Sequence, residues 1–337
     1  MKKVQKLLLL FFSLTLLASC KKTNESTYKK DRAKASSSNL ILGFSQIGAE
    51  SAWRKRNTES IQQAAAKANI QIVFNDAQQK QANQIKAIRS FIVYRVDVIA
   101  FVPIIETGWD NVLKDARDAK IPVFVVDRKI KVKDESLYAG YIGEDGFQEG
   151  CKAAQFLLDK YKDSKKHVIN ILELRGTENS SPATDRSLGF TSTIATDSRF
   201  SIIYSESGDF LRSRGKEIVS NIITENQGLN VKGSPIDIIF SHNDAMTLGV
   251  LDTLASHNIK SGDELTIVSV DGEEKAINAL KAGRINCVVE CNPNIGPQLM
   301  YLVKTIANRN TIPRETYIEE TVFTENDDLS SLAPRGY

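Results

Sequence analysis

Short apolar runs rich in β-branched residues alternate with amphipathic helical stretches along most of the chain. The apolar runs predict strands at residues 40–45, 71–75, 98–102, 123–127, 167–174, 201–205, 236–241, 265–270 and 285–290. Between the first strands, apolar residues recur at helical spacing over 54–68 and 82–93. This alternation predicts parallel sheets covered by helices on both faces. Because more than eight strands exceed one compact sheet of this kind, we expect two similar α/β domains.

Polar residues gather directly after the predicted strands. In open α/β sheets, ligands bind beyond the carboxyl ends of the strands, so these positions are candidates for a functional site. The residues concerned are Gln46, Glu50, Trp53 and Arg54 after the first strand, Asp127 and Arg128 after the fourth, residues 175–186 after the fifth, residues 242–244 after the seventh, Asp271 after the eighth, and Glu290 at the end of the ninth.

The N-terminus has the pattern of an export signal. A basic stretch over 1–6 precedes an apolar run over 7–18, which is too short to cross a bilayer as a helix. The small residues before Cys20 resemble the lipobox of bacterial lipoproteins, in which the cysteine is diacylated and becomes the first residue. An ordinary signal peptide with an incidental cysteine is the alternative. We predict a lipoprotein signal peptide at 1–19, lipid on Cys20 and a flexible, Lys/Ser-rich tether over 20–39.

The charge balance argues against nucleic acid as a partner. The chain has 44 Lys and Arg against 41 Asp and Glu. The surplus is Lys2, Lys3 and Lys6 of the export signal, so the mature chain is neutral. A phosphate-binding surface requires an excess of Lys and Arg, which this chain lacks.

Nucleotide, metal and hydrolase motifs are poorly matched. The segment from Gly208 to Lys216 fails the P-loop spacing, and residues 140–146 do not form G-x-G-x-x-G, so we interpret both sets of glycines as loop residues. The three histidines lack metal-ligand spacing and the chain has no Cys-x-x-Cys, so we predict no metal and no cofactor. A G-x-S-x-G elbow is also missing.

The remaining cysteines do not suggest a disulfide framework. With Cys20 lipidated, Cys151, Cys287 and Cys291 remain, and two positions four apart on one strand are about 13 Å apart, too far to bridge. We expect buried, unreactive thiols.

Carboxylates could instead act as a glycosidase pair, since Asp127, Asp271 and Glu290 could meet in one cleft. However, Arg128 follows Asp127, and Arg186 follows Asp185. Neighbouring cations keep carboxylates ionised, which suits hydrogen bonds to hydroxyl groups better than acid–base catalysis. We therefore favour a binding protein over an enzyme.

Trp53 is one of only two tryptophans and lies in the first predicted strand–helix connection. It could stack on the C–H face of a sugar, or it could simply pack at a helix N-terminus. The neighbouring Glu50 and Arg54 favour ligand contact.

Five segments together resemble the type I periplasmic sugar-binding proteins of ABC importers, the ribose- and galactose-binding group. They are IPVFVVDR at 121–128, DRSLGF at 185–190, SGDFLRSRG at 207–215, HNDAMTLG at 242–249 and VDG at 270–272. The likeness is greatest to the galactofuranose-binding subgroup, through residues 43–54, 78–91 and 106–109 and the terminal Gly336-Tyr337. LacI-type repressors share the fold but begin with a helix-turn-helix, where this chain has an export signal.

The resemblance implies two doubly wound parallel-sheet lobes joined by a three-crossing hinge. The N-terminal lobe would comprise 40–144 and 291–320, and the C-terminal lobe 145–290 and 321–337. The crossings would lie near 143–146, 290–292 and 319–323. Carried over by position, Glu50, Trp53, Arg54, Asp127 and Arg128 would line one wall of the site. Arg186, Phe210, Asn243 and Asp271 would line the other wall, with Glu290 beside a hinge.

The resemblance also implies the function. We expect a lipid-anchored, monomeric, extracytoplasmic protein that captures a monosaccharide, galactofuranose or a related aldose, between two closing lobes and delivers it to an ABC permease. The alternative is a sugar sensor that presents the closed form to a chemoreceptor or a membrane histidine kinase.

Overall fold

A computed structural model of the chain describes residues 40–49 and 51–337. The predicted signal peptide, the lipidation site Cys20, the tether and Glu50 lie outside the described residues. Residues 40–337 form one compact unit.

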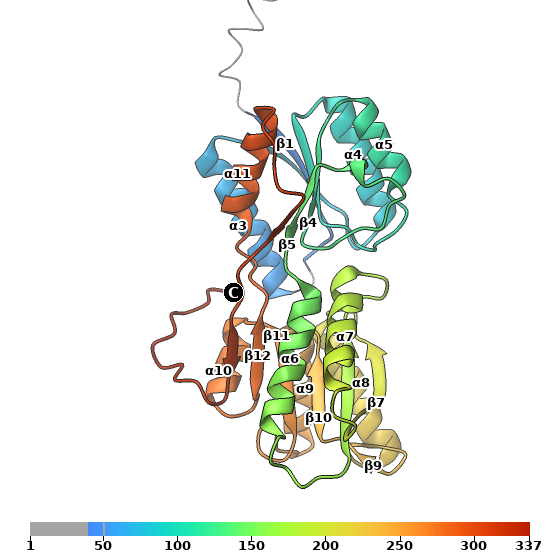
Figure 1. Ribbon diagram of the computed structural model, residues 1–337, viewed down its shortest axis with the longest axis vertical. Helices are drawn as coiled ribbons and strands as arrows, with labels where there is room; N and C mark the ends of the chain where they lie inside the picture. The colour runs from blue at the N-terminus through green and yellow to red at the C-terminus, as the bar shows by residue number, and fades with distance from the viewer. Residues whose placement is uncertain (1–39, 50) are drawn as a thin grey trace, which may run out of the picture. The chain divides into compact units, whose positions relative to one another are not determined.

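The first sheet is wholly parallel and forms, with its helices, what we call the N-lobe (Figure 1). Its strands run in the order β13-β5-β4-β3-β1-β2. Their bounds are β1 (Ile41–Gln46), β2 (Gln71–Asp76), β3 (Val98–Phe101), β4 (Val123–Val126), β5 (Gly140–Gly143) and β13 (Glu315–Tyr317). On one face, α3 (Ala52–Ala68) packs beside α11 (Gly296–Ala307). On the other lie α4 (Gln81–Tyr94), α5 (Asp110–Asp118) and the short 3₁₀ helix η1 (Glu135–Leu137).

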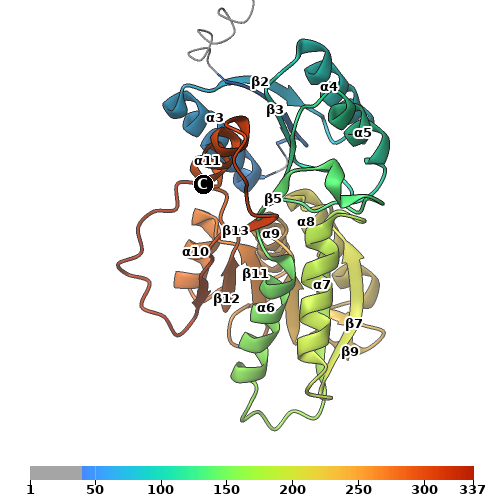
Figure 2. The ribbon, with the colours of Figure 1, turned by 45° about the horizontal axis from the view of Figure 1, so that its top comes forward.

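The second sheet forms the C-lobe, with strand order β14-β12-β11-β10-β6-β7. Its strands are β6 (Ile169–Arg175), β7 (Phe200–Ser207), β10 (Ile238–Ser241), β11 (Thr266–Asp271), β12 (Cys287–Glu290) and the antiparallel edge strand β14 (Val322–Thr324). One face is covered by α6 (Gly146–Lys160) and α7 (Ser181–Ile194), which pack together (Figure 2). The other is covered by α8 (Arg212–Asn226), α9 (Asp244–Ser256) and α10 (Glu274–Lys281). A small hairpin pairs β8 (Asn230–Val231) with β9 (Ser234–Pro235).

Both sheets have helices on their two faces, which confirms the predicted fold class of two doubly wound lobes. The chain passes between the lobes three times: from β5 to α6, from β12 to α11, and from β13 to β14. Each lobe therefore contains strands from distant parts of the chain, and the three connections run side by side between the lobes (Figure 1).

All nine predicted strands are present, with bounds shifted by a few residues, but the loop interpretation of residues 140–143 was wrong. They form β5, whose four residues are all buried. Its glycines reflect close packing, because a side chain at Gly143 would lie 2.8 Å from the Cα of Asp127. Gly215 is likewise in α8, where an added Cβ would lie 2.4 Å from the carbonyl oxygen of Met246.

The cysteines are only partly as predicted. Those within the described residues are free, but Cys151 is half-buried, whereas Cys287 and Cys291 are buried. Burial raises the pKa of both buried thiols, so their reactive thiolate forms are disfavoured.

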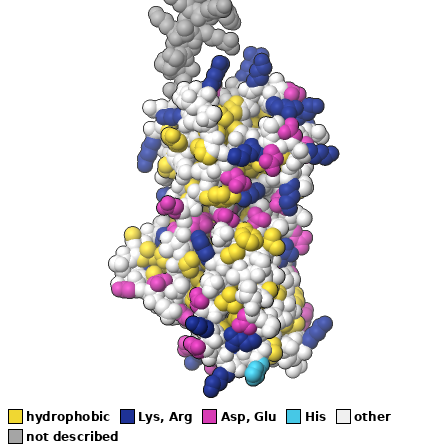
Figure 3. All heavy atoms as spheres, viewed as in Figure 1, with side chains coloured by type: hydrophobic (Ala, Val, Ile, Leu, Met, Phe, Trp, Pro, Cys, Tyr) yellow, Lys and Arg dark blue, Asp and Glu magenta, His cyan; other side chains and the backbone are white. Residues whose placement is uncertain are grey.

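Figure 3 shows Lys and Arg side chains interspersed with Asp and Glu over the face that it draws. Among residues 40–337 as described, the helices are all too short or too polar to cross a membrane.

Candidate functional site

A pocket lies between the carboxyl ends of the two sheets and is lined from both lobes. Its cavity volume is about 30 Å³, so the two walls lie close together in this structure. The lining residues are Ser51, Trp53, Arg54, Asp127, Arg128, Glu144, Pro182, Arg186, Phe210, Asn243, Asp271 and Cys291. This set includes all the predicted binding residues that the structure describes, except Glu290. Glu50 lies outside the described residues.

The lobes touch at the rim of this pocket. The backbone N–H of Lys129 donates to Ser181 Oγ at 2.6 Å, and that of Glu106 donates to the carbonyl oxygen of Asn179 at 2.9 Å. The first residue of each pair belongs to the N-lobe and the second to the C-lobe. The structure therefore represents an arrangement in which the two walls have come together.

Trp53 is placed by the start of α3, where Ser51 caps the helix by accepting a hydrogen bond from the N–H of Arg54 at 3.1 Å. The indole Nε1 donates to the carbonyl oxygen of Cys291 at 2.6 Å. Its ring belongs to the buried apolar cluster of the C-lobe that also contains Phe240 and Val270. Trp53 is thus an N-lobe side chain buried mainly in the C-lobe.

The N-lobe wall carries paired charges. Arg54 forms a buried ion pair with Asp127, whose carbonyl oxygen accepts a hydrogen bond from the hydroxyl of Tyr141 at 2.8 Å. Arg128 donates to the carbonyl oxygen of Ile104 at 3.2 Å. Both arginines are more than nine-tenths buried, which requires that their charges be compensated.

The C-lobe wall is organised around Arg186 of α7. Its Nε and Nη2 donate to the two carboxylate oxygens of Glu149 at 2.7 and 3.2 Å, and Nη1 donates to the carbonyl oxygen of His242 at 2.7 Å. Although burial lowers the pKa of Arg186, Glu149 raises it well above its usual value. The guanidinium is therefore permanently charged and held in a fixed plane beside the pocket.

Phe210 lies between two cations. The guanidinium carbons of Arg128 and Arg186 are 5.2 and 5.9 Å from the centre of its ring. The ring rests on Gly176, where an added Cβ would lie 1.9 Å from Phe210 Cζ. Since Arg128 belongs to the N-lobe, this cation–π contact crosses the pocket.

Asn243 joins two of these elements. It caps α9, because its Oδ1 accepts a hydrogen bond from the N–H of Met246 at 3.0 Å. Its Nδ2 donates to the carbonyl oxygen of Phe210 at 3.2 Å. The side chain therefore fixes the loop that carries the aromatic ring.

Three wall residues have strained backbone conformations. Asp127, Phe210 and Asp271 have φ angles of 64°, 61° and 127°, which side-chain-bearing residues seldom adopt. Such conformations cost about 1–3 kcal/mol each and cluster at ligand sites. The strain is typical of side chains that are aimed at a bound molecule.

Two carboxyl groups of the pocket have altered acidity. Burial, and then the neighbouring Asp244, raise the pKa of Asp271 well above its usual value. Burial, Asp127 and Glu149 raise the pKa of Glu144 in the same way. A protonated carboxyl group donates as well as accepts, so these side chains can serve both sides of a ligand hydroxyl.

Glu290 lies away from the pocket lining and holds the connections between the lobes. One carboxylate oxygen pairs with Arg335, and the other accepts a hydrogen bond from the N–H of Thr321 at 2.9 Å. The resemblance placed Glu290 beside a hinge. Of its two partners, Thr321 lies on the third connection between the lobes and Arg335 on the C-terminal segment.

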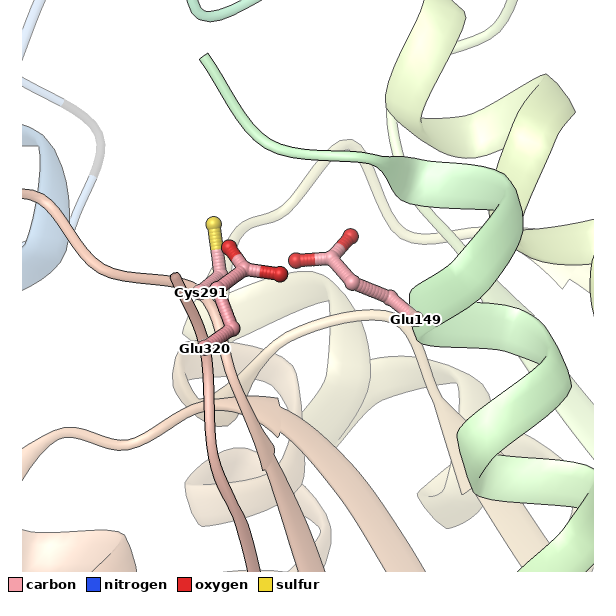
Figure 4. Close-up of side chains that lie close together, drawn as sticks. All are labelled: Glu149, Cys291 and Glu320. Carbon is pink, nitrogen blue, oxygen red and sulfur yellow. The ribbon is translucent and has the colours of Figure 1, made fainter. Parts of the chain in front are cut away.

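Behind the pocket, Glu149, Cys291 and Glu320 bring their side-chain atoms within 4.8 Å of one another (Figure 4). Such a group could hold a metal ion by distance alone. However, Glu149 is already bound by the Arg186 guanidinium, which repels a cation. Burial and Glu149 raise the pKa of Glu320 to about 9, which disfavours its metal-binding form. The donor set does not suit a metal.

Four lining residues were not predicted as binding residues: Ser51, Glu144 and Cys291, and also Pro182, which was covered only by the candidate range 175–186. Ser51 and Pro182 carried a detectable signal, since each stands at the start of a helix where N-caps and Pro are favoured. Cys291 accepts the hydrogen bond of the Trp53 indole with its backbone carbonyl, a contact that sequence cannot reveal. Glu144 lies in a lobe connection that the sequence suggested only as a hinge.

The arrangement suits a small neutral ligand with several hydroxyl groups. Arg54 and Arg186 each have a carboxylate partner, so a ligand anion is not needed to neutralise them. The aromatic faces of Trp53 and Phe210 supply apolar contact, and carboxyl, amide and guanidinium groups supply directed hydrogen bonds.

Comparison with known proteins identifies the family. Residues 42–311 match the periplasmic binding protein domain. The chain is 37% identical over 303 residues to the galactofuranose-binding protein YtfQ of Escherichia coli, covering 88% of this chain and 93% of that protein.

Two solved structures are also similar. One, from Mycobacterium smegmatis in complex with β-D-fucofuranose, has a TM-score of 0.80 at 40% identity and covers 85% of this chain and 91% of its own. The other is the periplasmic binding component of the arabinose ABC transporter of Shewanella sp. ANA-3, bound to α- and β-L-arabinofuranose. It has a TM-score of 0.79 at 39% identity, and the match covers 85% of this chain and 92% of that chain. These relatives are solute-binding proteins, which agrees with the prediction of a binding protein rather than an enzyme. The chain belongs to the periplasmic binding protein family.

Proposed function

We propose that this protein binds one monosaccharide between its lobes and delivers it to an ABC importer. The observation that carries the proposal is the pocket itself, which is lined from both lobes by two aromatic rings and by Arg, Asp, Glu and Asn side chains. A ligand that touches both walls gains contacts only when the lobes are together, so it shifts the population towards the closed form. A permease could then distinguish loaded protein from empty protein by shape.

Hydrogen-bonding groups fixed in direction give such a pocket its selectivity. Asp127 and Asn243 are tied to neighbouring groups and present defined donor and acceptor positions. An epimer that misplaces one hydroxyl leaves a buried polar group unpaired, at a cost of about 1–3 kcal/mol. The pocket should therefore distinguish closely related sugars by about tenfold or more.

We infer a furanose or a related aldose as the ligand. The supporting relatives, at 36–40% identity, are named or solved with galactofuranose, β-D-fucofuranose or L-arabinofuranose.

A thermal-shift screen tests this function. The panel comprises D-galactose, D-fucose, L-arabinose, D-ribose and D-fructose, with amino acids of similar size as controls. A sugar that binds only the folded protein should raise Tm by at least about 3 °C at saturation. The absence of a shift with every sugar, or equal shifts with the amino acids, would contradict the proposal. ¹³C NMR of a bound, C1-labelled sugar would then identify the ring form from its anomeric resonance.

We further propose that the mature protein is held outside the cytoplasm by lipid on Cys20. The supporting pattern is the apolar run that ends in small residues before that cysteine. Mass spectrometry of the N-terminal peptide should find a diacylglyceryl group on Cys20, and Cys20→Ala should release the protein from the membrane fraction. An unmodified Cys20 peptide would refute the anchor without affecting the sugar site.

A further inference from the structure

The turn between β11 and α10 is held rigidly by one buried carboxylate. Asp244 Oδ2 accepts hydrogen bonds from the N–H groups of Gly272 and Glu273, both at 2.7 Å, and Oδ1 accepts one from the hydroxyl of Ser269. Asp271, which lines the pocket, is therefore clamped together with Glu273, two residues further on. A displacement of Asp271 must also displace Glu273.

Glu273 reaches from this turn to the other lobe. Its Oε1 accepts a hydrogen bond from the backbone N–H of Trp53 at 3.1 Å, and both residues are about 95% buried. Trp53 is the second residue of α3, so its N–H is one of the donors that a helix leaves without an internal partner. Within α3, which is described throughout, the first turn contains no Asp or Glu. The C-lobe thus supplies a carboxylate to the positive end of an N-lobe helix.

The same helix start is held in the C-lobe by the Trp53 side chain. Its indole donates to the carbonyl oxygen of Cys291 at 2.6 Å, and its ring lies in the C-lobe core. Cys291 lies on the connection between β12 and α11, whereas Glu273 belongs to the C-lobe, so the hydrogen bond from the Trp53 N–H to Glu273 is the one that would be exchanged for water with the lobes apart.

We propose that Glu273 is a positioning residue that latches α3 onto the C-lobe and couples ligand contact at Asp271 to lobe closure. The inference rests on the proposed sugar-binding function, because closure is driven there by the ligand. Because the turn is already rigid, a sugar that draws Asp271 towards the N-lobe also brings Glu273 to the N–H of Trp53. The latch in turn retains the sugar, since the lobes must release Trp53 before they separate.

Burial of Glu273 works against closure in the absence of sugar. Burial raises the pKa of Glu273, and the hydrogen bond from Trp53 opposes this only in part. The ionised carboxylate therefore loses hydration when the lobes meet, and the ligand contacts offset this cost. The latch should hold loaded protein closed without closing empty protein.

The test compares Glu273→Ala and Glu273→Gln with wild type in stopped-flow sugar dissociation and in melting. Glu264→Gln, which changes an exposed carboxylate nearby in the sequence, is the matched control. With D-galactose, D-fucose or L-arabinose as probe, Glu273→Ala should accelerate dissociation about tenfold or more, while association changes by less than about twofold. Glu273→Gln, which keeps an acceptor oxygen, should be intermediate, and the control should match wild type. Melting of the sugar-free variants should stay within about 1 °C of wild type, because the latch forms only on closure.

Two results would overturn the latch. One is a sugar dissociation rate in folded Glu273→Ala that equals the rate of wild type. The other is a loss of sugar-free melting temperature as large as the loss with sugar, which would indicate a merely structural residue. Failure of wild-type protein to bind any probe sugar would instead overturn the proposed function, and this inference with it.

Discussion

Arg186, which lines the pocket, donates hydrogen bonds from two nitrogens to the two carboxylate oxygens of the buried Glu149, at 2.7 and 3.2 Å. The pair joins α7, which carries a wall of the pocket, to α6, which begins at the first lobe connection. The cation is thus compensated before any ligand arrives. Arg186 can therefore direct N–H groups at a neutral molecule without attracting an anion.

Arg186→Ala should be strongly destabilising, because it leaves the Glu149 charge buried and unpaired. We expect the free energy of unfolding to fall by about 3–5 kcal/mol, measured by urea titration. Arg89→Ala is the matched control, since its ion pair with Asp115 is about half exposed, and it should cost less than about 1 kcal/mol. Adding Glu149→Gln to Arg186→Ala should restore part of the stability but no sugar binding. Equal costs for Arg186→Ala and Arg89→Ala would contradict the account.

Trp53 should report ligand binding by its fluorescence. Trp53 lines the pocket, whereas Trp109, the other tryptophan, is fully buried in the N-lobe core. Trp109→Phe should therefore keep the fluorescence change on sugar addition, and Trp53→Phe should lose it. Trp53→Ala should also weaken calorimetric affinity by at least about tenfold, because stacking and interlobe contact are both removed. If the fluorescence change on sugar addition were still present in Trp53→Phe, the sugar would bind away from Trp53.

Arg128→Ala should weaken sugar binding by at least about tenfold without unfolding the protein. The side chain lines the pocket and contacts the Phe210 ring from the opposite lobe, so its loss removes both a hydrogen-bond donor and an interlobe contact. Titration calorimetry measures the affinity, and circular dichroism checks the fold. Unchanged affinity would remove Arg128 from the site.

Stability should fall as pH rises through the neutral range because of Glu320. Burial, followed by the charge of Glu149, raises its pKa to about 9 from 4.5. The folded protein therefore holds a proton that the unfolded chain releases above about pH 4.5. This contribution to stability is complete below that pH and is lost as the pH approaches 9.

Glu320→Gln mimics the protonated form and isolates this effect. One pKa unit corresponds to about 1.4 kcal/mol. Between pH 5 and pH 9, the free energy of unfolding of wild type should therefore fall by at least about 1.4 kcal/mol more than that of Glu320→Gln. Urea unfolding at pH 5, 7 and 9 measures both proteins. Parallel pH profiles would show that Glu320 titrates normally.

Sequence located the walls of the pocket because parallel sheets bring their carboxyl ends to one edge. Asp127 is the last residue of one predicted strand and Asp271 directly follows another, so their placement required only the strand pattern. Glu149 was not foreseen. It is 37 residues from Arg186, and only the packing of α6 on α7 brings them together.

The missed strands have a similar explanation. β13 and β14 have three residues each, and most of these residues are not buried. Such short segments show no alternation of apolar and polar residues by which a strand could be predicted. β5 was hidden by its glycines, which indicated a loop but in fact permit close packing beside Asp127.

A crystal structure with the sugar that gives the largest thermal shift would locate the ligand directly. We predict one sugar per chain between the lobes, with its ring against Trp53 or Phe210 and its hydroxyls within hydrogen-bonding distance of Asp127, Arg128 and Asp271. Sugar bound elsewhere, with this pocket filled only by water, would contradict it.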